Sequence, residues 1–282
     1  MNGFPLHPGK HALPAVPDPA EHAAYVRTTD PEADLSTFDG VVLLYQGRIL
    51  EHALRTFRTH PRPGWVRGGL HLVEDQGRGF ALCGGFGLGA PAAALVVEQL
   101  VALGTQRIIT VGTAASLQHD LRPGALVVCT SALRDEGLSH HYLPPGRTAS
   151  PSPALTRHLT EALAPFDAPV TCGSIWTTDA PYRETTTEVT RYGAEGILAA
   201  DMEAAAVFAV GHCRTVAVST VLAIADSLVD RPPRQHSPDT EHALHTALAA
   251  AAQALRTSTA SPLPSANTRV ELLVNRSRRA PL

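Results

Sequence analysis

Two stretches of the sequence each combine an apolar run with a carboxylate: Ala200-Asp201-Met202-Glu203-Ala204-Ala205-Ala206 and Val221-Leu222-Ala223-Ile224-Ala225-Asp226-Ser227. The first places the carboxylate of Glu203 at the start of an Ala-rich helix, and the second ends an apolar strand on Asp226, 23 residues later. In an α/β protein, ligands bind outside the carboxyl ends of strands and near helix starts. One acid there is suited to hold the hydroxyls of a sugar, and the other to exchange a proton with a leaving base.

Strand-like and helix-like segments alternate along the chain. Short apolar runs bounded by turns predict strands at 41–44, 69–74, 80–83, 108–111, 125–130, 170–174 and 215–225. Helix-like runs with start and stop signals predict helices at 51–60, 92–103, 153–163, 184–192, 202–210 and 240–255. This alternation predicts an α/β fold, a single domain with a mixed central sheet flanked by helices.

The predicted domain covers residues 39–256 and has a segment of different composition on each side. Residues 1–38 are rich in Pro, His and Asp with little periodicity, so we expect a loosely packed N-terminal arm. Residues 257–282 are rich in Ser, Thr and Pro and then in Arg, which predicts a disordered tail. Within the domain, residues 134–152 read as a polar loop.

Composition excludes several classes of partner. Apolar residues make up 44% of the 282 residues and charged residues 17%, so the chain can bury a sizeable core. The net charge of −3 argues against binding to nucleic acid or to an anionic membrane, because both bind basic surfaces. No uninterrupted apolar run approaches the roughly 20 residues that a membrane span needs.

The cysteines and the N-terminal residues indicate the cellular compartment in which the protein is expected. The four cysteines are widely spaced in apolar runs without a CxxC pair, so we expect four buried thiols in a reducing compartment: Cys83, Cys129, Cys172 and Cys213. The first ten residues lack the charged head and apolar core of a signal peptide. These features predict a cytoplasmic protein.

A glycine-rich loop, Gly84-Gly85-Phe86-Gly87-Leu88-Gly89-Ala90-Pro91, joins a predicted strand to a predicted helix. Glycine lets backbone N–H groups approach an anion at a helix start, so this loop is a candidate phosphate cradle. Its spacing does not match a dinucleotide fingerprint, because no acid about 20 residues further on ends a second strand. A tight strand–helix turn without a ligand is the alternative interpretation.

These motifs in combination resemble the purine and uridine phosphorylase family of nucleoside-cleaving enzymes, over residues 40–256. That family has a Gly-x-Gly-x-Gly-x-Pro-type loop in this position, and its next strand ends in a Val-Gly-Ser or Val-Gly-Thr turn. Val111-Gly112-Thr113 matches that turn. The resemblance implies a phosphate or water site at Gly87 and Thr113 and a single α/β domain. It also implies a homo-oligomer, either a dimer or a hexamer built from dimers.

The resemblance also assigns roles to the acidic residues. Met202 and Glu203 match the ribose clamp, in which a carboxylate accepts hydrogen bonds from vicinal hydroxyls while Met202 packs under the sugar. Asp226 matches the catalytic aspartate that serves N7 of the leaving base in the purine-specific branch. The alternative for Glu203 is a favourable interaction with the helix dipole, and the alternative for Asp226 is a helix or turn cap at a strand end.

Arginines complete the phosphate site of such enzymes, and here the chain departs from the pattern. Arg67 matches the arginine that reaches a neighbouring subunit's phosphate, with a plain surface arginine as the alternative. Thr110 stands where phosphorylases usually carry Arg. Leu44-Tyr45-Gln46-Gly47-Arg48 replaces their Pro-Gly-Asp-x-x-Arg loop, and Arg48 is the candidate substitute.

The base pocket of the family corresponds to Trp176, Asp179 and Tyr182 in this chain. Aromatic rings give a stacking surface for a flat base, although Pro181 replaces the family's usual stacking Phe. We expect no metal, because the adjacent His140 and His141 would point apart.

These observations predict a nucleoside phosphorylase that uses inorganic phosphate as co-substrate, needs no cofactor, and takes a nucleoside, with purines favoured by Asp226. Two alternatives stay open. The first is a nucleoside hydrolase that uses water on the same scaffold, which Thr110 favours. The second is a nucleoside-binding protein without catalysis, given the altered arginines.

Overall fold

One mixed ten-stranded sheet forms the centre of the molecule in the computed structural model, which describes residues 6–75, 78–233 and 235–257. Its strands are β1 (Val41–Leu44), β2 (Thr59–Pro61), β3 (Gly69–Asp75), β4 (Arg78–Gly84), β5 (Arg107–Ser116), β6 (Leu126–Asp135), β7 (Thr148–Ala149), β8 (Val170–Thr178), β9 (Ala199–Asp201) and β10 (Ala217–Ser227). The predicted α/β fold with a mixed central sheet is confirmed.

The pairing of the strands closes part of the sheet on itself. β5 pairs in parallel with β10, β10 runs antiparallel to β6, β6 pairs in parallel with β8, β8 with β9, and β9 returns antiparallel to β5. β1 lies beside β5 and leads through β4 and β3 to the edge strand β2. β1, β5 and β10 therefore run parallel side by side, and their carboxyl ends meet at one edge.

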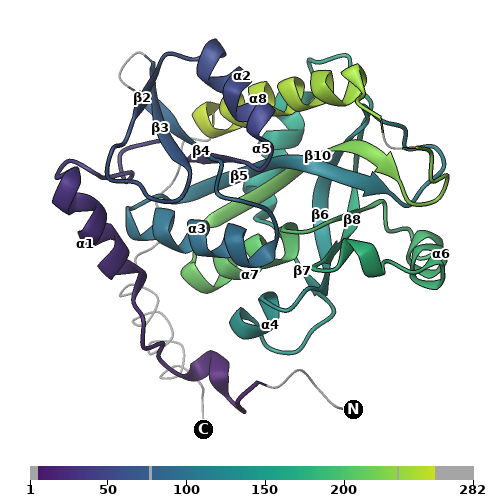
Figure 1. The fold of residues 1–282 in the computed structure, drawn as a ribbon, viewed down its shortest axis with the longest axis horizontal. Coiled ribbons are helices and arrows are strands. Elements are labelled where there is room, and N and C mark those ends of the chain that lie inside the picture. Colours follow the sequence, from purple (N-terminus) through teal and green to yellow (C-terminus); the bar gives the residue numbers. More distant parts are fainter. Residues whose placement is uncertain (1–5, 76–77, 234, 258–282) are drawn as a thin grey trace, which may run out of the picture.

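Helices cover both faces of the sheet (Figure 1). They are α1 (Pro19–Thr29), α2 (Gly47–Thr56), α3 (Ala90–Ala102), α4 (Ser139–Tyr142), α5 (Pro153–Leu163), α6 (Thr186–Ala194), α7 (Ala204–Arg214) and α8 (Pro238–Thr257), with short 3-10 turns at Lys10–Ala12 and Pro181–Arg183. In Figure 1, α2, α5 and α8 lie on one side of the sheet, and α1, α3 and α7 lie on the other.

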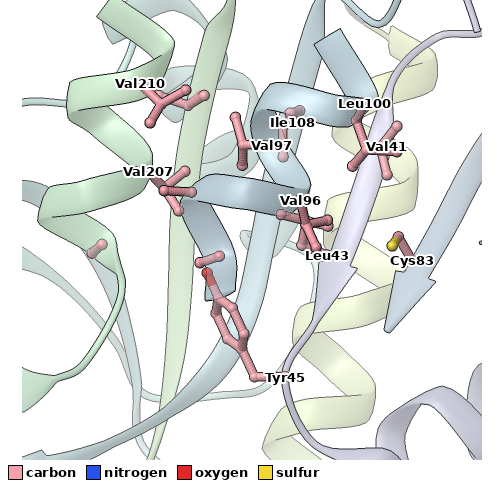
Figure 2. Close-up of a cluster of buried hydrophobic side chains, with 14 of the residues drawn as sticks. Val41, Leu43, Tyr45, Cys83, Val96, Val97, Leu100, Ile108, Val207 and Val210 are labelled. Atoms are coloured by element: carbon pink, nitrogen blue, oxygen red, sulfur yellow. The ribbon is translucent and has the colours of Figure 1, made fainter. Parts of the chain in front are cut away.

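Each face buries its own apolar cluster. Figure 2 shows the cluster on the α3–α7 side, where Val41 and Ile108 from the strands meet Val97 and Val207 from the helices. On the opposite face, α8 packs its alanines and leucines against β1, β5 and β10. Because β1 is covered on both faces, its residues read as a continuous apolar run with no alternation.

Element boundaries differ from the predictions at several places. α2 begins at Gly47, four residues before the predicted start, and α6 begins at Thr186 behind a capping box of Thr185 and Glu188. β6 continues to Asp135, and the predicted polar loop after it contains α4 and β7.

The N-terminal segment is more ordered than predicted. α1 begins at Pro19 behind an Asp18 cap and packs against α3, with Val26 fully buried and Ala23 and Leu35 in the same cluster. The prediction of a loosely packed arm is therefore wrong for residues 19–35, because a short stripe of buried residues suffices to dock this helix. The predicted disordered tail lies outside the described residues from position 258 onward.

Two of the four cysteines correct another prediction. Cys83 and Cys129 are buried in strands, as expected, but Cys172 and Cys213 are exposed. Cys172 lies in the first half of β8, which is less buried than the second half, and Cys213 lies in the last turn of α7 beyond its buried residues. In the part of the chain that the structure describes, none of the helices combines the length and the apolar character that a membrane crossing requires.

Candidate active site

A cavity of about 560 Å³ opens where β1, β5 and β10 end. Its walls come from the β1–α2 turn, the glycine loop before α3, the end of β5, and the start of α8. Among the residues predicted for the phosphate or water site, Gly87, Thr113 and Arg48 line this cavity, and Ala225 places the neighbour of Asp226 at its wall. The fold thus brings together residues from four separate parts of the sequence.

The glycine loop turns sharply before α3. Gly85, Gly87 and Gly89 have φ values of 75°, 103° and 92°, a region of backbone conformation that glycine adopts far more readily than other residues. Gly89 is the N-cap of α3, and Pro91 lies in the first turn of that helix. From this N-cap position the Gly89 N–H donates to the Glu203 carboxyl.

Glu203, the N-cap of α7, contacts this loop through its side chain. Its Oε1 accepts a hydrogen bond of 2.6 Å from Gly89 N–H, and its side chain is buried, with 5% of the residue exposed. Burial, together with the negative charge of Asp201, raises the pKa of Glu203 to about 8. A buried carboxyl that contacts backbone N–H is suited to exchange its hydrogen bond for hydroxyl groups of a ligand.

Asp201 holds the start of α7 in place. One of its oxygens accepts hydrogen bonds from the N–H groups of Glu203 and Ala204 at 3.1 and 2.8 Å, and the other accepts from the Thr177 hydroxyl at 2.6 Å. The Thr177 oxygen in turn accepts from Ala205 N–H at 3.1 Å. These bonds satisfy N–H groups that a helix start leaves without partners.

This positioning role of Asp201 was not predicted from the sequence, although a signal for it was present. An aspartate at the end of a strand and three residues before an Ala-rich helical run is a typical helix-capping pattern. Met202, between the two acids, is partly exposed, and its Cε lies 3.9 Å from the position that a Cβ would take on Gly89. Met202 and Glu203 therefore both adjoin the glycine loop.

Asp226 lies near the end of β10, where the strand loses its regular register with β5 between Ile224 and Asp226. Its Oδ1 accepts a hydrogen bond of 2.8 Å from Ser227 N–H, and the residue is partly exposed. A bulge of this kind re-aims side chains at a strand end and is frequent beside active sites. The structure thus places Asp226 next to the cavity wall that Ala225 forms.

The remaining phosphate-site candidates occupy different environments. Thr113 accepts a hydrogen bond of 3.0 Å from the Gln46 amide, and Arg48 approaches His236 at 3.5 Å between Nη1 and Nε2. Thr110 is fully buried in β5, and its hydroxyl shares a 2.8 Å hydrogen bond with Thr220 on β10. Arg67 is exposed and does not line this cavity.

The three base-pocket candidates do not converge in this chain. Trp176 is 1% exposed, packs edge-on against Tyr192, and donates from Nε1 to Asp135 at 2.9 Å. Asp179 is exposed and accepts from Gly137 N–H at 2.8 Å, and Tyr182 is 95% exposed. Their assignment to a base pocket stays a prediction.

The polar groups after β6 form a structural cluster. The Arg134 guanidinium donates to the Ser139 hydroxyl and to backbone carbonyls of the segment 139–146. His140 contacts the Arg134 carbonyl through its Nε2 at 3.2 Å. Among the described residues, no three His, Cys, Asp or Glu side chains gather so that they could hold a metal ion.

Comparison with known families identifies this arrangement. The family model described as the phosphorylase superfamily matches residues 66–260 of the chain. The chain belongs to the phosphorylase superfamily. The resemblance inferred from the glycine loop, the Val-Gly-Thr turn and the two acids is therefore confirmed.

Its relatives carry the names of nucleoside phosphorylases. A guanosine phosphorylase of Halorubrum lacusprofundi is 32% identical over 143 residues, which are 51% of this chain and 59% of that protein. A uridine phosphorylase of Treponema pallidum is 30% identical over 178 residues, covering 58% of this chain and 69% of the relative. The chain thus spans about three fifths of the first relative and about two thirds of the second.

Solved structures of similar fold include two nucleoside phosphorylases. Uridine phosphorylase from Vibrio fischeri has a TM-score of 0.68 at 25% identity, over 79% of this chain and 93% of that one. Purine nucleoside phosphorylase from Toxoplasma gondii, in complex with immucillin-H, has a TM-score of 0.70 at 19% identity, over 78% and 91%. The latter supports the fold alone.

Glu203 predicts a pH-dependent stability. Since its pKa is higher in the folded protein than its ordinary 4.5, the folded state binds more protons than the unfolded chain between about pH 4.5 and 8. Ionising this carboxyl therefore lowers the free energy of unfolding as the pH rises through that window, by at most about 1.4 kcal/mol per pH unit. We expect Glu203→Gln to gain stability relative to the parent chain over the same window.

Urea unfolding of both proteins across this range measures the effect. Glu161→Gln is the matched control, because Glu161 is exposed on α5. A difference in unfolding free energy between Glu203→Gln and the parent that stays constant with pH would show that Glu203 ionises normally.

Proposed function

We propose that the protein is a nucleoside phosphorylase that cleaves the N-glycosidic bond of a purine nucleoside with inorganic phosphate. The products are a free base and ribose 1-phosphate. The observation that carries the proposal is the buried Glu203 carboxyl, bonded to the glycine loop beside a cavity that Gly87, Thr113 and Arg48 line. No cofactor takes part in the proposed reaction.

Glu203 is the proposed ribose ligand. Its carboxylate would accept hydrogen bonds from the vicinal 2′ and 3′ hydroxyls, with Met202 packed under the sugar. As the sugar gains oxocarbenium character, its hydroxyls become more acidic and these bonds strengthen, which lowers the barrier. Because burial raises the pKa of Glu203 to about 8, this carboxyl ionises fully near neutral pH only when donors such as the ribose hydroxyls stabilise its charge.

The nucleophile would bind in the cavity. Backbone N–H at Gly87, the Thr113 hydroxyl and the Arg48 guanidinium are the groups available to hold phosphate oxygens. A phosphate oxygen forms the new bond to C1′ while the bond from C1′ to the base nitrogen breaks, and the electron pair of that bond passes to the base. Asp226 would give a proton to N7 of the base, so a neutral purine leaves.

The choice of a purine rests on Asp226. The relatives named above act on different bases by name, a guanosine and a uridine among them, so family membership does not select one. An acid beside the leaving base favours purines, because N7 accepts a proton as the bond breaks. Trp176, Asp179 and Tyr182 remain candidates for the base pocket only if the segment around Tyr182 moves toward the cavity.

Hydrolysis by water is the second candidate. It is favoured by the Thr110–Thr220 hydrogen bond, which puts two neutral hydroxyls where phosphorylases usually place an arginine. A site with fewer positive charges holds a phosphate dianion less tightly, and water competes better. Phosphorolysis stands first because Arg48 lines the same cavity.

Arg67 supports an oligomer. It is exposed here and lies outside the cavity of its own subunit, which fits an arginine that serves a neighbouring site. The four free thiols fit a reducing compartment, so we place the enzyme in cytoplasmic purine salvage.

A panel of purine and pyrimidine ribonucleosides, each with and without inorganic phosphate, tests the proposal. We expect purine release that requires phosphate, with ribose 1-phosphate as the second product, measured by chromatography. Glu203→Gln should lose about 10²-fold or more in kcat/KM, because one charged acceptor for the ribose is gone. Base release at the same rate without phosphate would assign the hydrolase, and ligand binding without release would assign a non-catalytic binder.

Asp226→Asn tests the proton donor. The amide still donates a hydrogen bond but delivers no proton, so purine nucleosides with poor leaving groups should react about 10²–10⁴-fold more slowly. An N7-alkylated purine nucleoside, whose base leaves without protonation, should be affected much less. Equal losses for both substrates would show that Asp226 positions the substrate and transfers no proton.

Mixed oligomers test the role of Arg67. Arg67→Ala subunits and Asp226→Asn subunits are each expected to be inactive alone, since every site then lacks one component. Mixing them should restore part of the activity, because some hybrid sites combine an intact Arg67 with an intact Asp226. A monomer in sedimentation velocity would contradict the shared site.

A further inference from the structure

Two helices that line the cavity, α2 and α8, carry matching pairs of side chains. On α2, Arg48 and His52 lie four residues apart, and on α8 Glu241 and His245 do the same, so each pair shares one face of its helix. The rings of His52 and His245 stack at 3.5 Å between centroids with an interplanar angle of 11°. This contact joins the two helices, which lie side by side in Figure 1.

One turn before the stacked rings on each helix, a third histidine connects Arg48 to Glu241. The Nε2 atom of His236 lies 3.5 Å from Arg48 Nη1 and 3.3 Å from Glu241 Oε2. All three side chains line the cavity. The imidazole of His236 therefore lies between a guanidinium and a carboxylate that come from different helices.

Arg48 and Glu241 are the main opposite charges of this cavity. Among its described lining residues, Arg48 is the only Lys or Arg, and Glu241 is the only acid. His245 also lines the cavity, but burial and the charge of His52 lower its pKa, so its neutral form is favoured near pH 7. A direct ion pair between Arg48 and Glu241 would thus neutralise the cation that the proposed phosphate site uses.

The position of His236 follows from the start of α8. Ser237 lies directly before this helix, its Oγ accepts a hydrogen bond from Thr240 N–H at 3.4 Å, and its carbonyl accepts from Glu241 N–H at 3.2 Å. Ser237 therefore caps the helix. Because His236 precedes this cap, its backbone is held close to the turn that carries Glu241.

A single imidazole nitrogen cannot serve both neighbours at once. With the ring proton on Nδ1, the lone pair of His236 Nε2 accepts a hydrogen bond from Arg48. With a proton on Nε2, that N–H donates to the Glu241 carboxylate, and Arg48 is left to bind another acceptor. A phosphate oxygen can therefore replace His236 at Arg48 while the imidazole remains paired with Glu241.

We propose that His236 is a positioning residue that keeps Arg48 from pairing with Glu241 and leaves its guanidinium available to phosphate. This inference rests on the proposed phosphorolysis, in which Arg48 holds the nucleophile. His236 does not touch the reacting atoms and acts through Arg48. Without the ring, an incoming anion competes with a carboxylate for the guanidinium, and carboxylates bind arginine strongly.

Isothermal titration of the whole protein with inorganic phosphate, without a nucleoside, tests the inference. His236→Ala lets Arg48 pair with Glu241, so we expect phosphate to bind about fivefold more weakly, the scale of a partly exposed ion pair. Adding Glu241→Gln to His236→Ala should restore the parent affinity, because no carboxylate then competes. His236→Gln should keep the parent affinity, since its amide offers an acceptor to Arg48 and a donor to Glu241.

Steady-state base release separates this role from a general structural one. In His236→Ala the KM for phosphate should rise about fivefold while kcat changes little, because phosphate that does bind reacts in the same place. His212→Ala and Glu161→Gln are the matched controls, since both side chains are exposed and lie outside the cavity lining, and both should keep the parent affinity. Thermal unfolding checks each variant, and His236→Ser replaces His236→Ala if the latter does not fold.

An unchanged phosphate affinity in His236→Ala, a loss that Glu241→Gln does not restore, or no phosphate binding by the parent protein would each overturn the inference. Phosphate-dependent base release by the parent with an unchanged affinity in His236→Ala would leave the proposed function standing and the inference refuted. The expected set of affinities in a protein that releases base without phosphate would do the reverse.

Discussion

The hydrogen bond from Gly89 N–H to the Glu203 carboxyl joins two segments that lie 114 residues apart in the sequence. On one side, the glycine loop has positive φ values at Gly85, Gly87 and Gly89, and its Gly89 N–H donates to Glu203. On the other side, Asp201 and Thr177 hold the first turn of α7, and Glu203 is fixed at its N-cap. The candidate site depends on this contact, because it sets the position of the proposed ribose ligand relative to the cavity.

Burial changes the ionisation of the Glu203 carboxyl in this contact. A carboxyl in water would be ionised at neutral pH and solvated, but the surroundings of Glu203 disfavour its charge. The same low-dielectric surroundings strengthen any hydrogen bond that a ligand makes there. Tyr45 shares these surroundings, since its phenol lies in the field of Glu203 and Asp201.

The sequence predicted the sheet, most helices and the family, because those depend on local patterns. The glycine loop, the Val111-Gly112-Thr113 turn and the spacing of Glu203 and Asp226 are all visible in the chain. What it did not predict depends on pairing across strands. Thr110 sits in an apolar run, and its bond to Thr220 follows only from the register of β5 with β10. The burial of Trp176 likewise follows only from the fold, which packs it against Leu133 of β6 and Ala200 of β9.

A crystal structure of the protein with a purine ribonucleoside analogue and phosphate would show whether Glu203 holds the ribose. We expect Glu203 to accept hydrogen bonds from the 2′ and 3′ hydroxyls, with phosphate bound between the glycine loop and Thr113. A nucleoside bound elsewhere, or a ribose without contact to Glu203, would contradict this expectation.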